Sequence, residues 1–240
     1  MHKVMVIAPH PDDETLGCGG ALLKYKSDGC EIHWLIMTDM KESDGYDASV
    51  IKMRDDEIQS VGNLYNFDSI NKLGLSTTKV DEYSMSELVN KISFVIDKIR
   101  PSIIYLPFKG DVHSDHGYVF DAAYSCTKSF RYPFIKKIYM MEILSETEFS
   151  LGVKENSFVP NVFIDISNYM DKKIEIMKVY ESEIGEHPFP RSERNIRALG
   201  TLRGATCGCD YAESFMLIKE CSGPLILDTF QATFSNSAIF

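Results

Sequence analysis

The 240-residue sequence contains no C-x-x-C pair and no excess of basic residues. Its six cysteines are scattered, apart from the C-x-C pair Cys207 and Cys209, so neither a zinc ribbon nor a disulfide framework is predicted. Acidic residues outnumber Lys and Arg by 35 to 25, and the formal net charge is -10. This balance argues against a general nucleic-acid-binding protein, which needs a basic surface.

Long apolar stretches are also missing. No run approaches the ~20 residues that a membrane-spanning helix needs, and the apolar segment near the N-terminus is too short for a signal peptide. We therefore expect no integral membrane segment and a cytoplasmic location. The composition, 44% hydrophobic and 25% charged, is that of an ordinary globular protein. Because a chain of this length can build a large core without a structural metal, a metal-ligand pattern in it indicates catalysis.

Strand and helix patterns alternate along most of the chain. Val4–Ala8 is a continuous apolar run typical of a strand buried on both faces, Thr15–Asp28 has helical spacing, and Glu31–Thr38 is a second predicted strand. This order predicts a βαβ unit and hence a parallel sheet. Further strands are expected at Ser69–Leu73, Ser102–Leu106, Lys136–Leu144 and Asn161–Ile166, and further helices at Ala48–Phe67, Ser84–Arg100, Asn168–Ser182 and Glu193–Arg203.

The pattern predicts one α/β domain over residues 1–240, with a mostly parallel, Rossmann-like sheet and helices on both faces. The sequence shows no internal repeat, low-complexity tract or linker. Residues 220–240 form an apolar tail that must pack against the domain or take part in a contact, and the tail favours a homo-oligomer weakly.

Two polar motifs follow two of the predicted strands. The segment HPDDE at residues 10–14 follows the first strand, and HSDH at residues 113–116 follows the strand at 102–106. Because ligands of doubly wound folds bind at the carboxyl ends of the strands, both motifs are expected at one edge of the sheet. A catalytic zinc takes three ligands from His, Asp or Glu and lowers the pKa of a water to about 7. A further carboxylate can take the proton of that water.

Each feature also has an ordinary structural explanation. Acidic residues before a helix often only complement the helix dipole, and His113 and His116 could share a helix face without binding anything. Gly17, Gly19 and Gly20 after a strand weakly suggest nucleotide binding, but the G-x-G-x-x-G spacing is missing. It is the combination of the two motifs at the corners of a buried sheet that indicates a metal site.

Together the motifs resemble those of the LmbE-like, or PIG-L, family of zinc-dependent N-acetylglucosamine deacetylases. The resemblance extends to the glycine-rich residues 17–20, to the R-x-x-E pair Arg54 and Glu57, and to segments 163–167, 180–182 and 211–215. It implies an LmbE-like domain that binds one Zn²⁺ per chain, or another divalent metal. It also implies removal of an N-acetyl group from a small-molecule substrate that contains an amino sugar, with release of acetate.

The resemblance implies roles for the residues of the first motif and for the last histidine of the second. His10, Asp13 and His116 match the zinc ligands of the family. Asp12 matches the general base that activates the water. Glu14 is expected to form hydrogen bonds that hold these residues in position without contacting the metal. The ordinary alternative is that its charge only complements the helix dipole.

Further residues are expected to face the substrate. His113 matches the histidine that stabilises the oxyanion, and Asp115 would pair with His113 and hold it protonated. Arg54 matches a substrate-binding arginine. The family's oxyanion tyrosine has no clear counterpart here. An arginine cluster could instead contact a phosphate or carboxylate of the substrate, or simply form a solvated helix face: Arg191, Arg194, Arg197 and Arg203.

Other functions stay open on the sequence. The same site could cleave a different amide, such as that of a sugar–thiol conjugate. A metal-dependent phosphoester hydrolase would more often hold two metals with more carboxylates. A non-catalytic sugar-binding protein would have no need of Asp12. The substrate could be a free amino sugar, a sugar nucleotide, a glycolipid head group, a thiol precursor or an antibiotic intermediate. The loop Asp39–Ser49 is expected to border the site.

Overall fold

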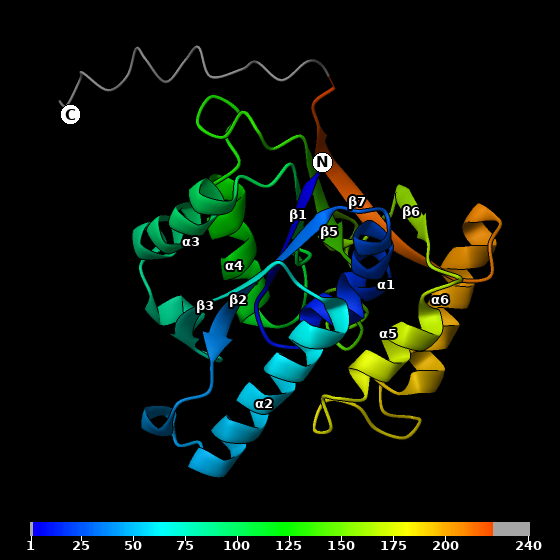
Figure 1. The fold of residues 1–240 in the computed structure, drawn as a ribbon, viewed down its shortest axis with the longest axis horizontal. Coiled ribbons are helices and arrows are strands. Elements are labelled where there is room, and N and C mark those ends of the chain that lie inside the picture. The colour runs from blue at the N-terminus through cyan, green and yellow to red at the C-terminus, as the bar shows by residue number, and fades with distance from the viewer. Residues whose placement is uncertain (1, 223–240) are drawn as a thin grey trace.

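The computed structural model describes residues 2–222, which form one seven-stranded sheet in the order β3-β2-β1-β4-β5-β7-β6 (Figure 1). The strands β1 to β5 pair in parallel, whereas β7 runs antiparallel to both of its neighbours, β5 and β6. The strands are β1 (Lys3–Ala8), β2 (Glu31–Asp39), β3 (Ser69–Ser76), β4 (Ile103–Leu106), β5 (Lys137–Met141), β6 (Val162–Asp165) and β7 (Ala212–Glu220). The predicted mostly parallel α/β sheet is confirmed, and β7 is an addition to the predicted strands.

Helices cover both faces of the sheet, as Figure 1 shows. Along β1, Val4 and Val6 pack into one apolar cluster while Met5 and Ile7 pack into the other, so the strand is buried on both sides as predicted. The helices α3 (Met85–Ile99) and α4 (Ser114–Ser125) belong to the second cluster. Four other helices pack into the first cluster, the one that contains Val4 and Val6: α1 (Asp13–Ser27), α2 (Ala48–Tyr65), α5 (Met170–Met177) and α6 (Glu193–Cys207). Short 3-10 turns are η1 (Glu42–Asp44), η2 (Val80–Glu82) and η3 (Lys154–Asn156).

The ends of α3 lie where the sequence signals place them. Ser84 precedes the helix, and its side chain accepts a hydrogen bond from the backbone N–H of Glu87, which is an ordinary N-cap. Arg100 has a left-handed backbone conformation directly before Pro101, which cannot continue a helix. The helix α4, by contrast, is not among the predicted elements, since its first turn contains the HSDH motif.

The strand order reverses between β1 and β4. From β1 the chain builds β2 and β3 on one side of the sheet, and it then returns to build β4 and β5 on the other side. The segments that leave the carboxyl ends of β1 and β4 therefore diverge and leave a crevice between them, as in other doubly wound sheets. This arrangement brings residues 10–14 and 111–116 to the same place.

The glycine-rich stretch of α1 allows close packing of the helix. A Cβ atom on Gly20 would lie 2.6 Å from Cγ2 of Ile166, which is too close for two carbon atoms. Ile166 follows β6, so any larger side chain at this position would push α1 away from that end of the sheet. The stretch is thus explained by packing, without a bound nucleotide.

A buried ion pair holds α1 against the C-terminal half of the sheet. The helix is interrupted at Cys18, whose φ and ψ are -147° and 21°. The backbone N–H groups of Gly20 and Ala21 each donate to the carboxylate of Glu213 at 2.8 Å. Lys173 of α5 donates to the same carboxylate at 2.7 Å, and both charged side chains are buried. Glu213 therefore caps the second half of α1 and ties it to α5 and β7.

Parts of the sequence-based expectation lie beyond the described region. The predicted apolar tail begins at Glu220, which is the last residue of β7, and most of it falls outside residues 2–222. Within that described range, no helix is both long and apolar enough to cross a membrane. Self-association and a cytoplasmic location stay predictions.

We expect Lys173→Met to lower the free energy of unfolding by about 3–5 kcal/mol, because the buried Glu213 carboxylate loses its cation. The matched control is Lys172→Met, which removes an exposed lysine paired with Glu175 within the same helix. That change should cost less than about 1 kcal/mol. Urea denaturation of the two variants and the parent measures both values. Equal and small losses would show that the buried pair does not stabilise the packing of α1.

Candidate active site

A cavity of about 200 Å³ opens at the carboxyl edge of the sheet, where the strand order reverses. Residues 10–13, after β1, form one wall together with His113, before α4. Residues 38–40, at the carboxyl end of β2, and residues 77–78, after β3, also line the cavity. Met40 and Tyr46 also line it, so the loop Asp39–Ser49 borders the cavity as expected.

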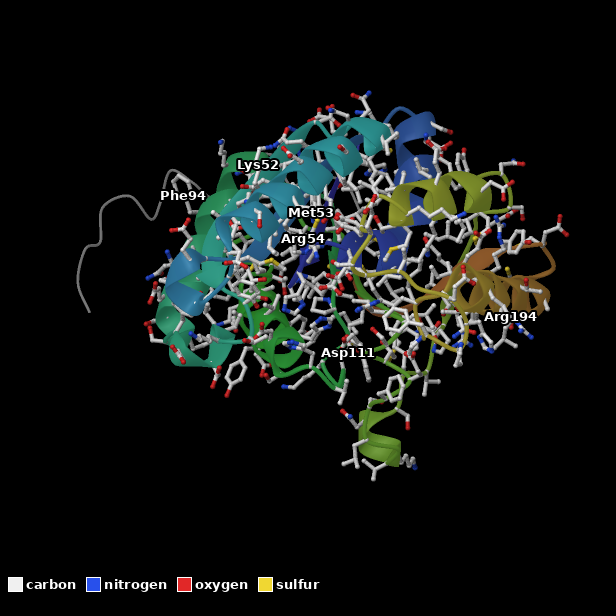
Figure 2. The ribbon with its side chains drawn as sticks, turned by 90° about the horizontal axis from the view of Figure 1, so that it is seen from below. Lys52, Met53, Arg54, Phe94, Asp111 and Arg194 are labelled. Carbon is white, nitrogen blue, oxygen red and sulfur yellow. The ribbon has the colours of Figure 1, made fainter. Side chains whose placement is uncertain are left out.

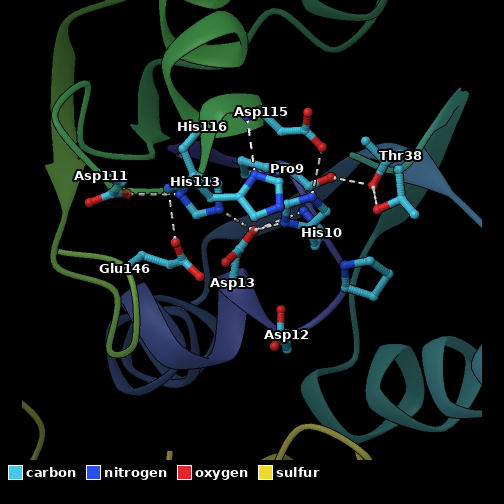
Figure 3. A network of polar contacts seen from close by, with 12 residues as sticks. Pro9, His10, Asp12, Asp13, Thr38, Asp111, His113, Asp115, His116 and Glu146 are labelled. Atoms are coloured by element: carbon cyan, nitrogen blue, oxygen red, sulfur yellow. Dashed lines mark hydrogen bonds and ion pairs between the residues drawn. The ribbon is translucent and has the colours of Figure 1, made fainter. Parts of the chain in front are cut away.

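Three donor atoms converge beside this cavity. Nδ1 of His10 lies 3.5 Å from Oδ2 of Asp13, and Nε2 of His116 lies 3.4 Å from the same oxygen (Figure 3). Donors at about 2.0–2.1 Å from a tetrahedral zinc are about 3.3 Å apart, so these spacings suit one small metal ion. The buried Nε2 of His116 has no hydrogen-bond partner among residues 2–222. A metal ion would satisfy that nitrogen, since buried polar atoms are rarely left unpaired.

Each of the two histidines is oriented by a carboxylate on its other nitrogen. Nε2 of His10 lies 3.0 Å from Oδ2 of Asp115, and Nδ1 of His116 lies 2.8 Å from Oδ2 of Asp111. Thr147 donates its hydroxyl to the other oxygen of Asp111 at 2.7 Å. Carboxylates placed in this way fix the ring orientation and the tautomer of metal-binding histidines. They leave Nδ1 of His10 and Nε2 of His116 facing Asp13.

A second group of possible ligands, His10, His113 and Asp115, fits a metal less well. The carboxylate of Asp115 already accepts backbone N–H groups from Thr78 at 2.8 Å and from Val80 at 3.2 Å. Nδ1 of His113 accepts the backbone N–H of Asp115 at 3.1 Å. Oδ2 of Asp13 also accepts a backbone N–H, that of His10 at 2.8 Å, but the buried Nε2 of His116 has no partner among the described residues, so the group with His116 is the better metal site.

The contacts of Asp115 differ from the pairing that the resemblance implied. Its carboxylate bonds to His10, and only its backbone N–H reaches the His113 ring. The reason is the start of α4: His113 is the N-cap residue, whereas Asp115 lies in the first turn and faces the loop after β3. Burial and the nearby His10 lower the pKa of His113. The structure therefore gives His113 a neutral ring with its proton on Nε2, which corrects the expectation that Asp115 holds it protonated.

Asp12 is held in an unusual backbone conformation. Its φ of 127° is one that residues other than glycine rarely adopt, and such strain costs on the order of 1–3 kcal/mol. The buried carboxylate of Glu14 accepts the Asp12 backbone N–H at 3.1 Å, and it also accepts hydroxyl groups from Thr15 and Tyr180. Glu14 thus lies behind the strained residue. Figure 3 shows Asp12 beside Asp13, without a drawn contact to the histidines.

The two neighbouring aspartates have opposite electrostatic environments. Burial and the charge of Asp13 raise the pKa of Asp12. For Asp13 burial acts in the same direction, but His116 and His10 outweigh it and lower the pKa. Asp13 is therefore an anion between two imidazoles, as a metal ligand should be, while Asp12 is the more readily protonated carboxyl group.

Several cavity residues are absent from the sequence-based prediction. Glu146 follows β5, lines the cavity and accepts the backbone N–H of His113 at 3.2 Å. Glu183 follows α5 and also lines the cavity. No motif marks either residue, because their loops reach the site only in the folded chain. Asp111 could have been recognised from the sequence, because it is an acidic residue two positions before His113 of the second motif.

The arginines divide between the cavity and the surface. Arg54 lines the cavity but is buried against Glu57 and Glu183, so its role in substrate binding stays a prediction. Of the cluster of four arginines, Arg191 lines the cavity and lies 3.7 Å from Asp12. The others pair elsewhere or face solvent: Arg197 binds Glu193 and Asp171, Arg203 binds Glu142, and Arg194 is exposed. Figure 2 shows Arg54 near the middle of the molecule and Arg194 at its edge.

A family model and two related proteins point to the same family of deacetylases. The family model PIG-L, GlcNAc-PI de-N-acetylase, matches residues 5–127. The diacetylchitobiose deacetylase of Thermococcus kodakarensis is 25% identical over 227 residues, which cover 90% of this chain and 83% of that protein. A probable N-acetyl-alpha-D-glucosaminyl L-malate deacetylase 2 of Bacillus anthracis is 21% identical over 188 residues, or 75% and 80% of the two chains.

Among solved structures, a similar one is the 4-carboxy-2-hydroxymuconate hydratase of Pseudomonas putida KT2440. Its TM-score is 0.70 at 14% identity, and the match covers 93% of this chain and 99% of that chain. This likeness shows the fold alone. Because a hydratase shares the fold, the reaction must be argued from the residues of the site.

We expect His116→Ala to lose the metal, whereas His113→Ala should retain about one divalent ion per chain, because His116 completes the favoured donor set. His113 belongs to the rival group, which makes it the matched control. Elemental analysis after dialysis measures the metal, and circular dichroism checks that both variants fold. Retention in His116→Ala together with loss in His113→Ala would assign the metal to the rival group.

Proposed function

Because the chain belongs to the PIG-L family, we propose that it is a metal-dependent hydrolase that removes an N-acetyl group from an amino-sugar-containing substrate. The observation that carries this proposal is the convergence of three donor atoms beside a separate carboxylate, Asp12, on one cavity. Two relatives named as deacetylases of N-acetylated sugars support the substrate class. We propose zinc as the metal, since two imidazoles and one carboxylate form a common catalytic zinc set.

In this proposal His10, Asp13 and His116 hold the metal. When bound, zinc polarises the acyl oxygen and lowers the pKa of a water molecule. Asp12 takes a proton from the water while the water oxygen forms a bond to the acyl carbon. The same carboxyl group then returns the proton to the nitrogen as the C–N bond breaks, so that acetate and a free amine leave.

His113 is proposed to stabilise the charge that develops on the acyl oxygen. It lines the cavity, and its Nδ1 is occupied by the backbone N–H of Asp115. The proton of the neutral ring is therefore on Nε2, from which it can donate a hydrogen bond to the oxyanion. Because the N-cap position fixes the ring before substrate arrives, no rearrangement is needed during the reaction.

We expect Asp12→Asn to lower kcat by about 10²–10⁴-fold, because an amide cannot take the proton, while metal content stays unchanged. The control is Asp56→Asn, which changes an exposed aspartate of α2 that pairs with Lys52. Acetate release and metal content are measured on the same preparations. Full activity in Asp12→Asn would show that another group is the base.

The reaction itself is tested by acetate release from a panel of N-acetylated amino sugars with the zinc-loaded protein. We expect release from at least one of them and its loss after chelation. Cleavage of a sugar–thiol amide without deacetylation would favour the related amidase. Two metals per chain with phosphoester hydrolysis would favour a phosphoesterase, and sugar binding without acetate release would favour a binding protein.

A further inference from the structure

The two terminal nitrogens of Arg54 are held by protein oxygens. Its Nη2 pairs with Oε1 of Glu183 and donates to the hydroxyl of Ser182 at 3.0 Å. Its Nη1 donates to the carbonyl oxygen of Pro11 at 3.3 Å, and its Nε lies 3.3 Å from Oε2 of Glu57. Both terminal nitrogens thus donate to protein oxygens, and Nε lies close to the Glu57 carboxylate without a hydrogen bond, although the side chain lines the cavity.

Arg191, the other arginine that lines the cavity, is held by the same glutamate. Its Nη2 donates to Oε2 of Glu183 at 2.9 Å, and its Nε donates to the backbone oxygen of that residue at 2.8 Å. Its Nη1 donates to the hydroxyl of Ser145 at 3.2 Å. The carboxylate of Glu183 therefore bridges both arginines and fixes them in place, and Glu57 supplies a second negative charge beside Arg54.

The cavity lining is acidic overall. Among residues 2–222, the only Lys or Arg side chains that line the cavity are those of Arg54 and Arg191. The lining also includes five carboxylates: Asp12, Asp13, Asp39, Glu146 and Glu183. With neutral histidines and all five carboxylates ionised, the lining keeps a net negative charge even after a divalent metal is added. Two lysines outside the lining are paired with carboxylates, because Lys72 binds Asp39 and Lys79 binds Asp44.

Such a lining suits hydroxyl groups better than anions. A carboxylate accepts hydrogen bonds and repels a phosphate or a second carboxylate. Sugar hydroxyls are donors, and the oxygens of Asp39 and Glu146 at the cavity wall are acceptors for them. An anion would have to break the bonds of Glu183 to both arginines before it found a cation.

Resting on the deacetylase function proposed above, we infer that the cavity takes an uncharged N-acetylated sugar and discriminates against substrates that carry a phosphate or carboxylate beside the acetamido ring. Glu183 is the residue that determines this selectivity, because it occupies the arginines that would otherwise bind the anion. The arginines hold the site together instead of binding substrate charge.

The test compares two substrates of similar size, methyl N-acetyl-α-D-glucosaminide and N-acetyl-α-D-glucosamine 1-phosphate. Acetate release by the zinc-loaded protein should give a kcat/KM at least about tenfold higher for the neutral glycoside, since like charges oppose binding of the phosphate. Glu183→Gln should shift this ratio toward the phosphate, mainly through a lower KM for it. Both rates come from one preparation, so a loss of folded protein cancels in the ratio.

The matched control is Glu193→Gln, which removes a carboxylate from Arg197 outside the cavity and should leave the ratio unchanged. Equal or faster turnover of the phosphate by the parent protein would overturn the inference while leaving the deacetylase function intact. A ratio that Glu183→Gln does not move would remove Glu183 as the determinant. Acetate from neither compound, nor from the wider panel of amino sugars, would instead overturn the proposed function.

Discussion

The neighbouring strands β1 and β4 lie at the point where the strand order of the sheet reverses, and the arrangement of the site depends on this reversal. The chain leaves the two strands toward opposite sides, so the segments after them open a crevice that side chains from both can enter. His10 and Asp13 come from one segment, and His116 comes from the other. Without the reversal, these donors would have no common centre.

Around this crevice, the buried carboxylates have hydrogen-bond partners. Asp115 orients His10, Asp111 orients His116, and Glu14 holds the backbone of Asp12. Carboxylates buried in this way are costly unless they are hydrogen-bonded, so each one needs its partner in a defined position. The result is a site whose side chains are in place before any ligand binds, which is the condition for stabilising charge that develops during a reaction.

The same principle explains why arginines in a cavity need not bind an anion. A guanidinium that is paired with glutamate adds less positive field, and its planar group can connect several loops. Arg54 and Arg191 connect the loop after β1, the segment after β5 and the segment after α5 in this manner. The charges that face the cavity are then those of the carboxylates.

The sequence by itself determined the α/β class, the parallel strands and the two motifs that supply His10, Asp13 and His116. Apolar runs, helical spacing and motifs are local properties, and each can be recognised from a few neighbouring residues. Tertiary structure decided that the carboxylate of Asp115 bonds to His10 and not to His113, that Glu183 holds both arginines, and that β7 joins the sheet. These contacts connect residues far apart in the chain, and a carboxylate in a sequence carries no mark of the partner that burial will give it.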